Sequence, residues 1–578
     1  MRTLVNPQQT RLFDPFDGVL TPKARRRLLD SWPGVFRHVL LELMPAEALA
    51  EHFDAAMGRP SKELYSMAGL IFLAEYFDWT KDEALNAYCF HMDVHYALNL
   101  EPVAQELSMR TLERNIARFK NDALAEAVMA DVTVRLVELL GIKIDTQRLD
   151  STHIFSDMAR FGRTRLMGVA IKRFLTQLKR HDLGAYEGLD DALRQRYAPG
   201  VNQLFADTAK DSESRRLLRQ QVAEDMHILV KQFADHPKHA DKTTYQAMER
   251  IFYEQCNVQE DKVTVKTKTG GNVMQNPSDP DATYDGHKGP GYQAQLSETC
   301  HPDNDVQLIT CAIPQTAAEA DSDAVEPVLD DLEHNALLPE QLLGDTHYCS
   351  DENVQQAAQR GVELVGPVSG SEKSKEEASY ERLTIDDFDI DEHTEEVKCC
   401  PAGHKPDTSV PDEQTGKTTT VMPASACSGC DFYEQCPVEK CKGQYRLKHS
   451  AKQRRLAARR REENTEVFGQ RYKIRGGIEG TNSGVKRVTG LGQLRVRGRP
   501  AVFHAIYLKV AGWNMRRAMV CAKLRKIVYE RAAGAVLCRI IAILRHLLTT
   551  QCVYRWDKTQ NKTCLRQSGS FPPLPTAA

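Results

Sequence analysis

Strand-like and helical segments alternate between residues 282 and 370, and this alternation limits the folds that the chain can adopt. Short segments rich in apolar and β-branched residues, typical of strands, cover 291–299, 306–313, 341–344 and 362–368. Segments with the apolar spacing of helices lie between them, at 322–332 and 353–360. Strands that alternate with helices predict an α/β sheet with at least partly parallel strands, and the strand-like segment 142–155 can begin this sheet.

The first 141 residues show the three- and four-residue apolar spacing of helices, which predicts an all-α N-terminal domain. Within it, Ser108 can cap a helix whose apolar face leaves Arg110 and Arg114 on other faces. A helix of this kind can present arginine to a DNA groove, so Arg110 and Arg114 are candidate DNA contacts. The alternative is an ordinary surface helix with solvated arginines.

Charge is distributed unevenly along the chain. The formal net charge of −3 argues against a nucleic-acid partner only if the charges are evenly mixed. Residues 446–531 contain 23 Lys and Arg against 5 Asp and Glu, an excess of 18 positive charges. So large an excess predicts an electrostatic contact with nucleic acid, whereas the acidic stretch 371–397 is typical of a solvated connector.

The N-terminus reaches Asn6-Pro7 before any apolar run forms, so it lacks the apolar core of a secretory signal. The apolar stretch 534–548 contains Arg539 and Arg545 and is shorter than the roughly 20 residues of a membrane span. We therefore expect a cytoplasmic protein with no membrane partner. In that reducing compartment the 15 Cys are not expected to form a disulfide framework.

Three segments place an acid where metal or phosphate chemistry needs one. Asp150 and Asp345 each follow apolar residues at the end of a predicted strand. In the third segment four polar side chains lie at steps of three, four and seven residues, which on a helix brings them onto or near one face. They are Tyr472, Arg475, Glu479 and Lys486, although four glycines weaken the helix prediction.

The order of these segments and the Tyr-x2-Arg-x3-Glu-x6-Lys signature resemble the bacterial insertion-sequence transposases of the DDE superfamily. The resemblance is to the insertion-sequence-1182 type, which is related to the insertion-sequence-4 group. Residues 11–16, residues 281–288 and the cysteine-bearing insert extend it over nearly the whole chain. It implies an α/β, ribonuclease-H-like catalytic core that is split by insertions and preceded by a helical DNA-binding region.

The resemblance also implies a function and an assembly. Such enzymes bind double-stranded DNA at the terminal inverted repeats of their own element, cut the ends and join them to target DNA. They work in a multimer that holds both ends, so we expect at least a homodimer on DNA.

The expected organisation follows from the pattern and the resemblance together. The chain divides into a helical DNA-binding domain at 1–141, core segments at 142–165 and 281–370, a charged helical insertion at 166–280, an acidic and Cys-rich insert at 371–445, a basic region with the glutamate helix at 446–531, and a C-terminal helix and tail at 532–578.

Phosphodiester cleavage and strand transfer are in-line displacements, which two divalent ions can assist at the entering and leaving oxygens. Mg²⁺ prefers a few carboxylates together with substrate oxygens. We therefore predict Asp150, Asp345 and Glu479 as catalytic ligands of Mg²⁺ or Mn²⁺. Arg475 and Lys486 are predicted to hold DNA phosphates. Tyr472 either contacts DNA, by stacking on a base or touching a phosphate, or is a packing residue.

Six Cys fall within residues 399–441. A thiolate, a distant pair spaced by two residues and a further thiolate suit a tetrahedral, structural Zn²⁺ site. The preferred ligands are Cys400, Cys427, Cys430 and Cys436, with His404, Cys399 and Cys441 as substitutes. The alternative is a set of free thiols in a disordered insert.

Two other functions remain open. One is a non-catalytic DNA-binding regulator derived from such an enzyme, and the other is a Mg²⁺-dependent nuclease without strand transfer. The three acids, the arginine and the lysine are all intact, which favours an active enzyme.

Overall fold

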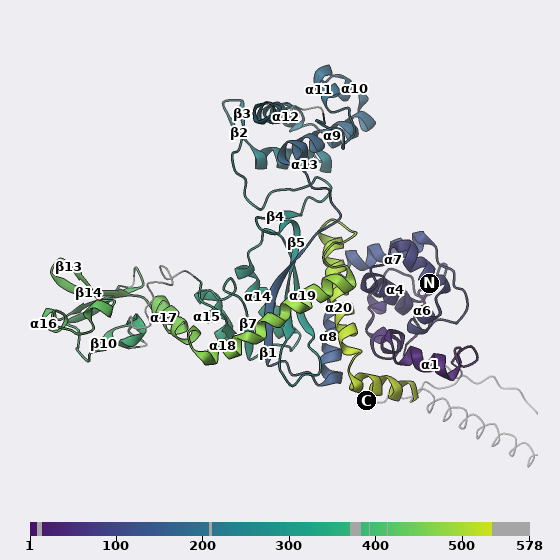
Figure 1. The fold of residues 1–578 in the computed structure, drawn as a ribbon. Helices are drawn as coiled ribbons and strands as arrows, with labels where there is room; N and C mark the ends of the chain where they lie inside the picture. Colours follow the sequence, from purple (N-terminus) through teal and green to yellow (C-terminus); the bar gives the residue numbers. More distant parts are fainter. Residues whose placement is uncertain (8–13, 207–210, 370–382, 392, 413, 534–578) are drawn as a thin grey trace, which may run out of the picture. The chain divides into compact units, whose positions relative to one another are not determined.

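The computed structural model describes residues 1–7, 14–206, 211–369, 383–391, 393–412 and 414–533. The segment 11–13, the apolar stretch 534–548 and the predicted C-terminal tail lie outside these residues. The chain divides into two compact units, and the division falls within helices α4 (Leu64–Tyr76) and α5 (Lys81–Phe90). Figure 1 shows the helices and strands of both.

The first unit comprises residues 1–66 and 86–106 together with the chain from Ala522 onward. Its helices are α1 (Pro22–Leu29), α2 (Trp32–Val35), α3 (Ala46–Ala50) and α6 (Met92–Ala97). The ring of Phe16 packs edge-on against Tyr96 at 5.1 Å, and the guanidinium of Arg37 lies over the same tyrosine at 4.5 Å. Buried aromatic and aliphatic residues therefore give this unit a core of its own.

The second unit is built on a mixed sheet. Its main strands are β1 (Thr146–Ile154), β5 (Gly289–Thr299), β6 (Ile309–Thr316), β7 (Gln341–Leu343) and β8 (Glu363–Val365). They lie in the order β6-β5-β1-β7-β8, and short β4 (Thr283–Asp285) pairs with the start of β5. Strand β5 is antiparallel to both of its main neighbours, β6 and β1, whereas β1, β7 and β8 are parallel. The predicted α/β sheet with partly parallel strands is therefore confirmed.

Helices pack around this sheet. They are α7 (Met109–Asn121), α8 (Leu124–Leu140), α14 (Val325–His334), α15 (Asp351–Gln359), α18 (Glu466–Tyr472), α19 (Gly477–Thr489) and α20 (Arg499–Ala518). Asn514 joins three elements, because its amide nitrogen donates to Thr133 Oγ1 of α8 at 3.0 Å and its oxygen accepts from the backbone of Ile309 in β6 at 2.9 Å. The last two helices of the first 141 residues thus belong to the unit that contains the sheet.

A helical insertion follows β1. It contains α9 (Arg163–His181), α10 (Leu183–Glu187), α11 (Asp191–Arg196), α12 (Ser212–Phe233), α13 (Thr243–Gln255) and the hairpin β2 (Cys256–Gln259)–β3 (Lys262–Val265). Its apolar side chains form a separate core in which Phe174 packs against Phe233 at 5.0 Å.

The cysteine-bearing insert is a small β structure with its own core. A four-stranded antiparallel sheet has the order β11-β12-β14-β13, and a two-stranded ribbon pairs β9 with β10. These elements are β9 (Asp389–Ile390), β10 (Val397–Cys399), β11 (Thr408–Asp412), β12 (Lys417–Met422), α16 (Ala424–Cys427), β13 (Glu439–Cys441) and β14 (Gln444–His449), and the basic helix α17 (Ala451–Glu463) follows them.

None of the helices in the described part of the chain combines the length and the apolar character that a membrane span requires.

Candidate active site

Two of the predicted acids lie on neighbouring parallel strands. In the pairing of β1 with β7, Arg148 lies opposite Leu343. Asp150 and Asp345 each follow two residues later, so they occupy equivalent positions just beyond this ladder. The prediction that Asp150 ends its strand is wrong, because the antiparallel pairing of β1 with β5 continues to Ile154. Asp150 marks the end of the parallel pairing alone.

The third acid, Glu479, lies in the first turn of α19. The four signature residues do not share one helix, which corrects that prediction. Tyr472 ends α18, and Arg475 lies in a 3-10 turn, Lys473–Gly476, between the two helices. The guanidinium of Arg148 donates to the carbonyl of Ile474 at 2.9 Å within this turn, so a tertiary contact accompanies the break.

The guanidinium of Arg475 brings the three acids together. Its Nη2 lies 2.9 Å from Asp150 Oδ1 and 3.7 Å from Asp345 Oδ2. Its Nη1 lies 3.9 Å from Glu479 Oε1. Asn482, one turn after Glu479 on α19, donates to the other oxygen of Asp150 at 3.1 Å. Residues that are more than 300 positions apart in the chain thus converge on one cation.

The electrostatics of Asp150 reflect its position inside this cluster. Burial raises the pKa of its carboxyl above the ordinary value, Arg475 opposes this rise, and the negative charge of Asp345 adds to it. Because the charged form is costly here, a cation that enters among these carboxylates would be strongly favoured.

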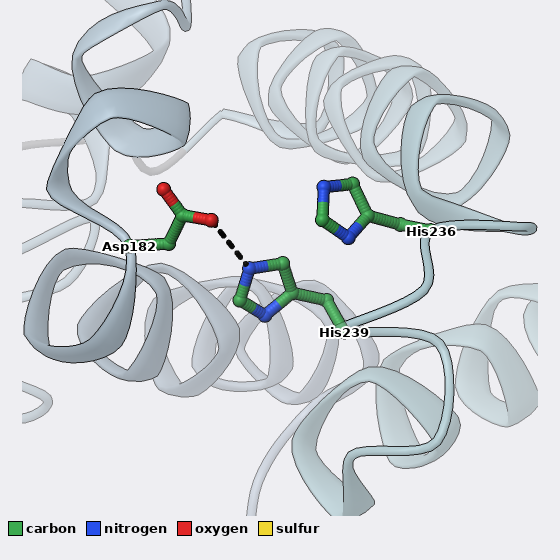
Figure 2. Close-up of side chains that lie close together, drawn as sticks. All are labelled: Asp182, His236 and His239. Atoms are coloured by element: carbon green, nitrogen blue, oxygen red, sulfur yellow. Dashed lines mark hydrogen bonds and ion pairs between the residues drawn. The ribbon is translucent and has the colours of Figure 1, made fainter.

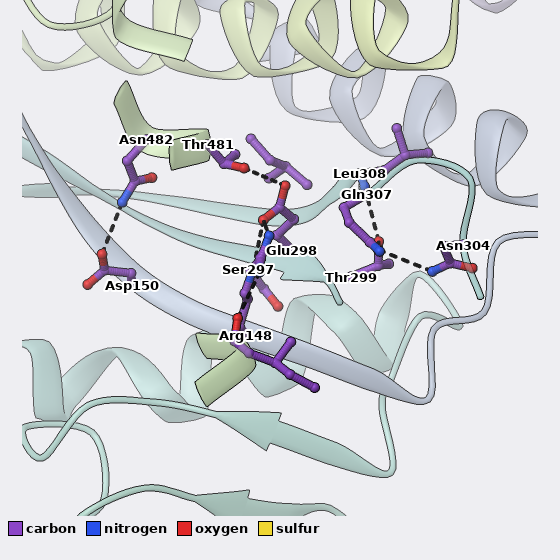
Figure 3. A network of polar contacts seen from close by, with 12 residues as sticks. Arg148, Asp150, Ser297, Glu298, Thr299, Asn304, Gln307, Leu308, Thr481 and Asn482 are labelled. Atoms are coloured by element: carbon purple, nitrogen blue, oxygen red, sulfur yellow. Dashed lines mark hydrogen bonds and ion pairs between the residues drawn. The ribbon is translucent and has the colours of Figure 1, made fainter. Parts of the chain in front are cut away.

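A buried polar network holds α19 against the sheet (Figure 3). Arg148 donates from Nε and Nη2 to Glu298 Oε2 of β5, at 2.8 and 2.6 Å. The second oxygen of Glu298 accepts from Thr481 Oγ1 of α19 at 2.7 Å. Since Arg148 also bonds Ile474, these contacts fix the segment that carries Arg475 and Glu479.

Two glycines of α19 allow side chains from other elements to approach the helix backbone closely, which explains why glycine stands at these helical positions. A β-carbon on Gly477 would lie 2.0 Å from Arg148 Nη1, and one on Gly484 would lie 2.5 Å from the ring of Trp513. Both distances are far below van der Waals contact. Two of the four glycines that weakened the helix prediction therefore mark places where α19 meets its neighbours.

Two of the three acids border a cleft of about 820 Å³. Asp150 and Glu479 line it together with the basic residues Lys288, Lys486 and Arg487. Lys288 Nζ donates to Ser151 Oγ at 3.1 Å. Burial and the charge of Lys288 lower the pKa of Lys486. Carboxylates beside amines suit a ligand that is anionic and also binds metal, as a phosphodiester does.

His153 also lines this cleft. Burial, followed by the charges of Lys288 and Lys486, lowers its pKa to about 4, so the imidazole is neutral at neutral pH.

Sequence reasoning did not identify Lys288, Asn482, Arg148 or Glu298. The spacing of Asn482 from Glu479, three residues on a helix, was a usable signal. The partnership of Arg148 with Glu298 depends on the antiparallel register of β1 and β5, in which the two lie opposite each other, and single-chain patterns do not reveal that register.

The remaining predicted DNA contacts do not line the cleft. Tyr472 is half-buried and its ring stacks on Phe468, with 5.5 Å between centroids. Arg110 and Arg114 are exposed on α7, whose predicted cap Ser108 accepts from the backbone of Thr111 at 3.2 Å. Packing contacts thus surround Tyr472, and both arginines are accessible to solvent.

The four preferred zinc ligands lie around one small cavity: Cys400, Cys427, Cys430 and Cys436. Tight turns present two of them, because Gly403 donates to the carbonyl of Cys400 at 2.8 Å and Cys430 donates to that of Cys427 at 3.5 Å. Burial raises the pKa of Cys427 to about 11, and the other three thiols add to the rise. In the described residues no three of these sulfurs lie within 4.8 Å of one another, so metal binding would require them to draw closer.

We compared the chain with protein families, curated proteins and solved structures. Residues 399–519 match the family model described as Transposase DDE domain, and this segment contains Arg475, Glu479 and Lys486. No curated protein matches the chain. A cryo-EM structure of the piggyBac transposase synaptic complex with hairpin DNA is 9% identical, over 66% of this chain and 72% of that chain, with a TM-score of 0.20. So low a score carries no argument. The family match supports a transposase of the DDE superfamily, and the mixed α/β sheet is consistent with a ribonuclease-H-like core.

Proposed function

We propose that the protein is an insertion-sequence transposase that binds the terminal inverted repeats of its element, cleaves DNA at the ends and joins them to a target. The observation that carries this proposal is the convergence of Asp150, Asp345 and Glu479 on Arg475 beside a cleft lined by amines. The match of residues 399–519 to the DDE domain supports the same reaction class.

The donor set fits a divalent metal. Three carboxylates that face the guanidinium of Arg475 are hard oxygen ligands of the kind that Mg²⁺ and Mn²⁺ prefer. In the described residues, oxygens from these three acids do not lie within 4.8 Å of one another, so metal binding would require them to draw closer. Asp150, Asp345 and Glu479 would hold the ions. When bound, such ions stabilise negative charge on the entering and leaving oxygens of a phosphoryl displacement.

The residues of the chain supply binding and orientation. Lys288, Lys486 and Arg487 bind phosphate oxygens of the DNA strand in the cleft. Arg475 reduces the mutual repulsion of the carboxylates, and Asn482 orients Asp150 through its hydrogen bond. Neutral His153 borders the same cleft without adding positive charge at neutral pH.

Cleavage assays test the proposal. The purified protein is incubated with Mg²⁺ and linear DNA that carries the element's ends, beside the variants Asp150→Asn, Asp345→Asn and Glu479→Gln. Each variant is expected to bind DNA but to lose at least 100-fold in cleavage. Asp157→Asn and Glu352→Gln are matched controls, since both acids are exposed and lie outside the cleft.

The outcomes separate the alternatives. Undiminished cleavage by any of the three site variants removes that residue from the site. Binding without cleavage by the intact protein favours a regulator, and cleavage without joining favours a nuclease. Sedimentation of the DNA complex tests the proposed homodimer.

A further inference from the structure

The helical insertion contains a pocket of about 710 Å³ that belongs to neither of the sites described above. It lies between α9 and the segment that leads into α13. Five basic side chains line it, and its lining contains no Asp or Glu: Lys172, Arg173, Arg180, Lys238 and Lys242. Such a lining favours an anionic ligand.

The positive charges in this pocket are largely uncompensated. Lys172 Nζ donates to the carbonyls of Tyr197 and Ala198, both at 3.0 Å, and Arg173 donates to the hydroxyl of Ser278. These acceptors are neutral. Lys238 approaches a carboxylate, at 3.9 Å from Asp182 Oδ2. The other four Lys and Arg side chains of the pocket form no ion pair in the described part of the chain.

The N-terminus of α13 also opens on the pocket. Thr243 and Thr244 line it, the N-cap residue Lys242 makes no side-chain cap, and the first turn contains no acid. The first amide groups of a helix lack partners within the helix and carry a partial positive charge, so they favour an anion. The hydroxyl of Thr244 bonds Gln177, which holds this helix start against α9.

A buried imidazole supplies an independent indication. His239 lines the pocket and is only 2% exposed, and its Nδ1 has no hydrogen-bond partner in the described structure. Its Nε2 lies 3.3 Å from Asp182 Oδ2, and Figure 2 shows the ring of His239 between Asp182 and His236. The buried Nδ1 that lacks a partner is therefore a polar atom that a ligand in the pocket can satisfy.

The same cluster also has the spacing of a metal site, because ligand atoms of Asp182, His236 and His239 lie within 4.8 Å of one another. The charge of the surrounding side chains favours an anion over a divalent cation. A divalent cation would lie beside Lys238, which already approaches the one carboxylate of the group, and close to a pocket lined by four further cationic side chains. An anion in the pocket meets five cationic side chains against the single carboxylate of Asp182, which Lys238 approaches.

We infer that this pocket binds a phosphate group of the DNA backbone, which makes the helical insertion a second DNA contact. The inference rests on the proposed function, because only a DNA-handling protein brings a phosphodiester to this surface. Phosphate recognition through Lys, Arg and a helix N-terminus carries no base information, so the contact strengthens binding equally for all sequences.

Binding of full-length protein to duplex DNA, measured by fluorescence anisotropy over a range of NaCl concentrations, tests the inference. The pocket variant is Arg180→Glu/Lys242→Glu, in which both changed residues are exposed. We expect at least a tenfold loss of affinity at low salt. The slope of log K against log salt should become shallower by about 0.9, since the pocket holds one phosphate and each phosphate contact contributes about 0.9. The charge-matched control Lys262→Glu/Lys268→Glu, on exposed residues of the same insertion, should retain affinity and slope.

Several outcomes would overturn the inference. Equal losses in the pocket and control variants would show a general charge effect. Thermal stabilisation by inorganic phosphate that the pocket variant loses, with DNA binding unchanged, would assign the pocket to free phosphate. Zinc binding that His236→Ala abolishes, again with unchanged DNA binding, would assign it to a metal. If the wild type binds DNA and the pocket variant binds it equally, only this inference fails, whereas a wild type that binds no DNA removes the proposed function as well.

Discussion

At the scale of single residues, the candidate site depends on groups that do no chemistry themselves. Arg148 and Glu298 lie buried on adjacent strands and connect the sheet to α19 through Ile474 and Thr481. A buried ion pair contributes little when intact, but removal of one partner leaves an uncompensated charge. The position of Glu479 therefore depends on this pair.

Replacement of Arg148 tests this dependence. Arg148→Met should lower the free energy of unfolding by about 3–5 kcal/mol, because Glu298 would remain buried without its partner. The double variant Arg148→Met/Glu298→Gln should recover part of that loss, and urea unfolding measures both. A double variant whose free energy of unfolding is no higher than that of Arg148→Met would contradict this account.

Asp150 and Asp345 were predictable from sequence because each follows a short apolar segment, and Glu479 was predicted from the spaced signature and its resemblance to the DDE transposases. The contact of these acids with Arg475 was not predicted. Arg475 was predicted to hold DNA phosphates, and in this structure it contacts Asp150 and Asp345 instead. That prediction remains untested, since a phosphate can replace a carboxylate as the partner of a guanidinium.

At the scale of elements, the strands of the core agree with the sequence pattern to within a few residues, because short apolar segments bounded by turn residues are a strong local signal of buried strands. The helix that carries Glu479 has no such signal. Its glycines lower helix propensity, and the contacts that explain Gly477 and Gly484 are visible only once the fold is known.

Gly477→Ala and Gly480→Ala form a matched pair on α19. A β-carbon at Gly477 would collide with Arg148 Nη1, and none of the atoms near Gly480 lies within 4 Å of such a carbon. Gly477→Ala should therefore displace α19 and reduce cleavage at least tenfold. Gly480→Ala should stabilise the helix by about 0.5–1 kcal/mol, since alanine loses less backbone entropy. Thermal unfolding and DNA cleavage distinguish the two, and equal effects would refute the proposed contact.

The cysteine insert gives a second prediction at this scale. If Cys400, Cys427, Cys430 and Cys436 bind zinc, metal analysis of the full-length protein should find one ion, and Cys427→Ser should abolish it. A chelator should then make residues 385–449 sensitive to protease, because metal binding would stabilise this small core. Cys441→Ser is the control, since that thiol is exposed. Full zinc binding by Cys427→Ser would exclude the site.

At the scale of the whole molecule, charges that are segregated in sequence recombine in the structure. Arg454 pairs with Glu395 at 2.7 Å, and Arg461 contacts Asp386 and Asp387 at 2.9 and 2.6 Å. The described part of the acidic stretch is therefore more than a solvated connector, because three of its carboxylates pair with arginines of α17. Much of the excess positive charge in residues 446–531 is used internally. Lys486 and Arg487 face the cleft instead, and it is there that we expect DNA.

A buried histidine makes the free energy of unfolding depend on pH. His504 lies in the interior of the second unit, where its ring packs edge-on against Phe119 at 5.4 Å. Burial, with a smaller contribution from the charge of Lys120, lowers its pKa from 6.5 to about 3. The folded state therefore holds His504 neutral, while the unfolded chain takes up a proton at this residue below about pH 6.5.

Stability should therefore fall as the solution becomes more acidic. The contribution of His504 to stability is fully present above pH 6.5 and is lost as pH falls from 6.5 towards 3, by up to about 1.4 kcal/mol for each pH unit. Urea unfolding followed by tryptophan fluorescence between pH 7.5 and 4.5 should show a shallower loss of stability in His504→Gln than in the wild type, because glutamine does not titrate. His287→Gln, at an exposed histidine, is the control. Parallel pH profiles for the wild type and His504→Gln would mean that this imidazole is not held neutral in the fold, and that the acid sensitivity of the second unit arises from its carboxylates.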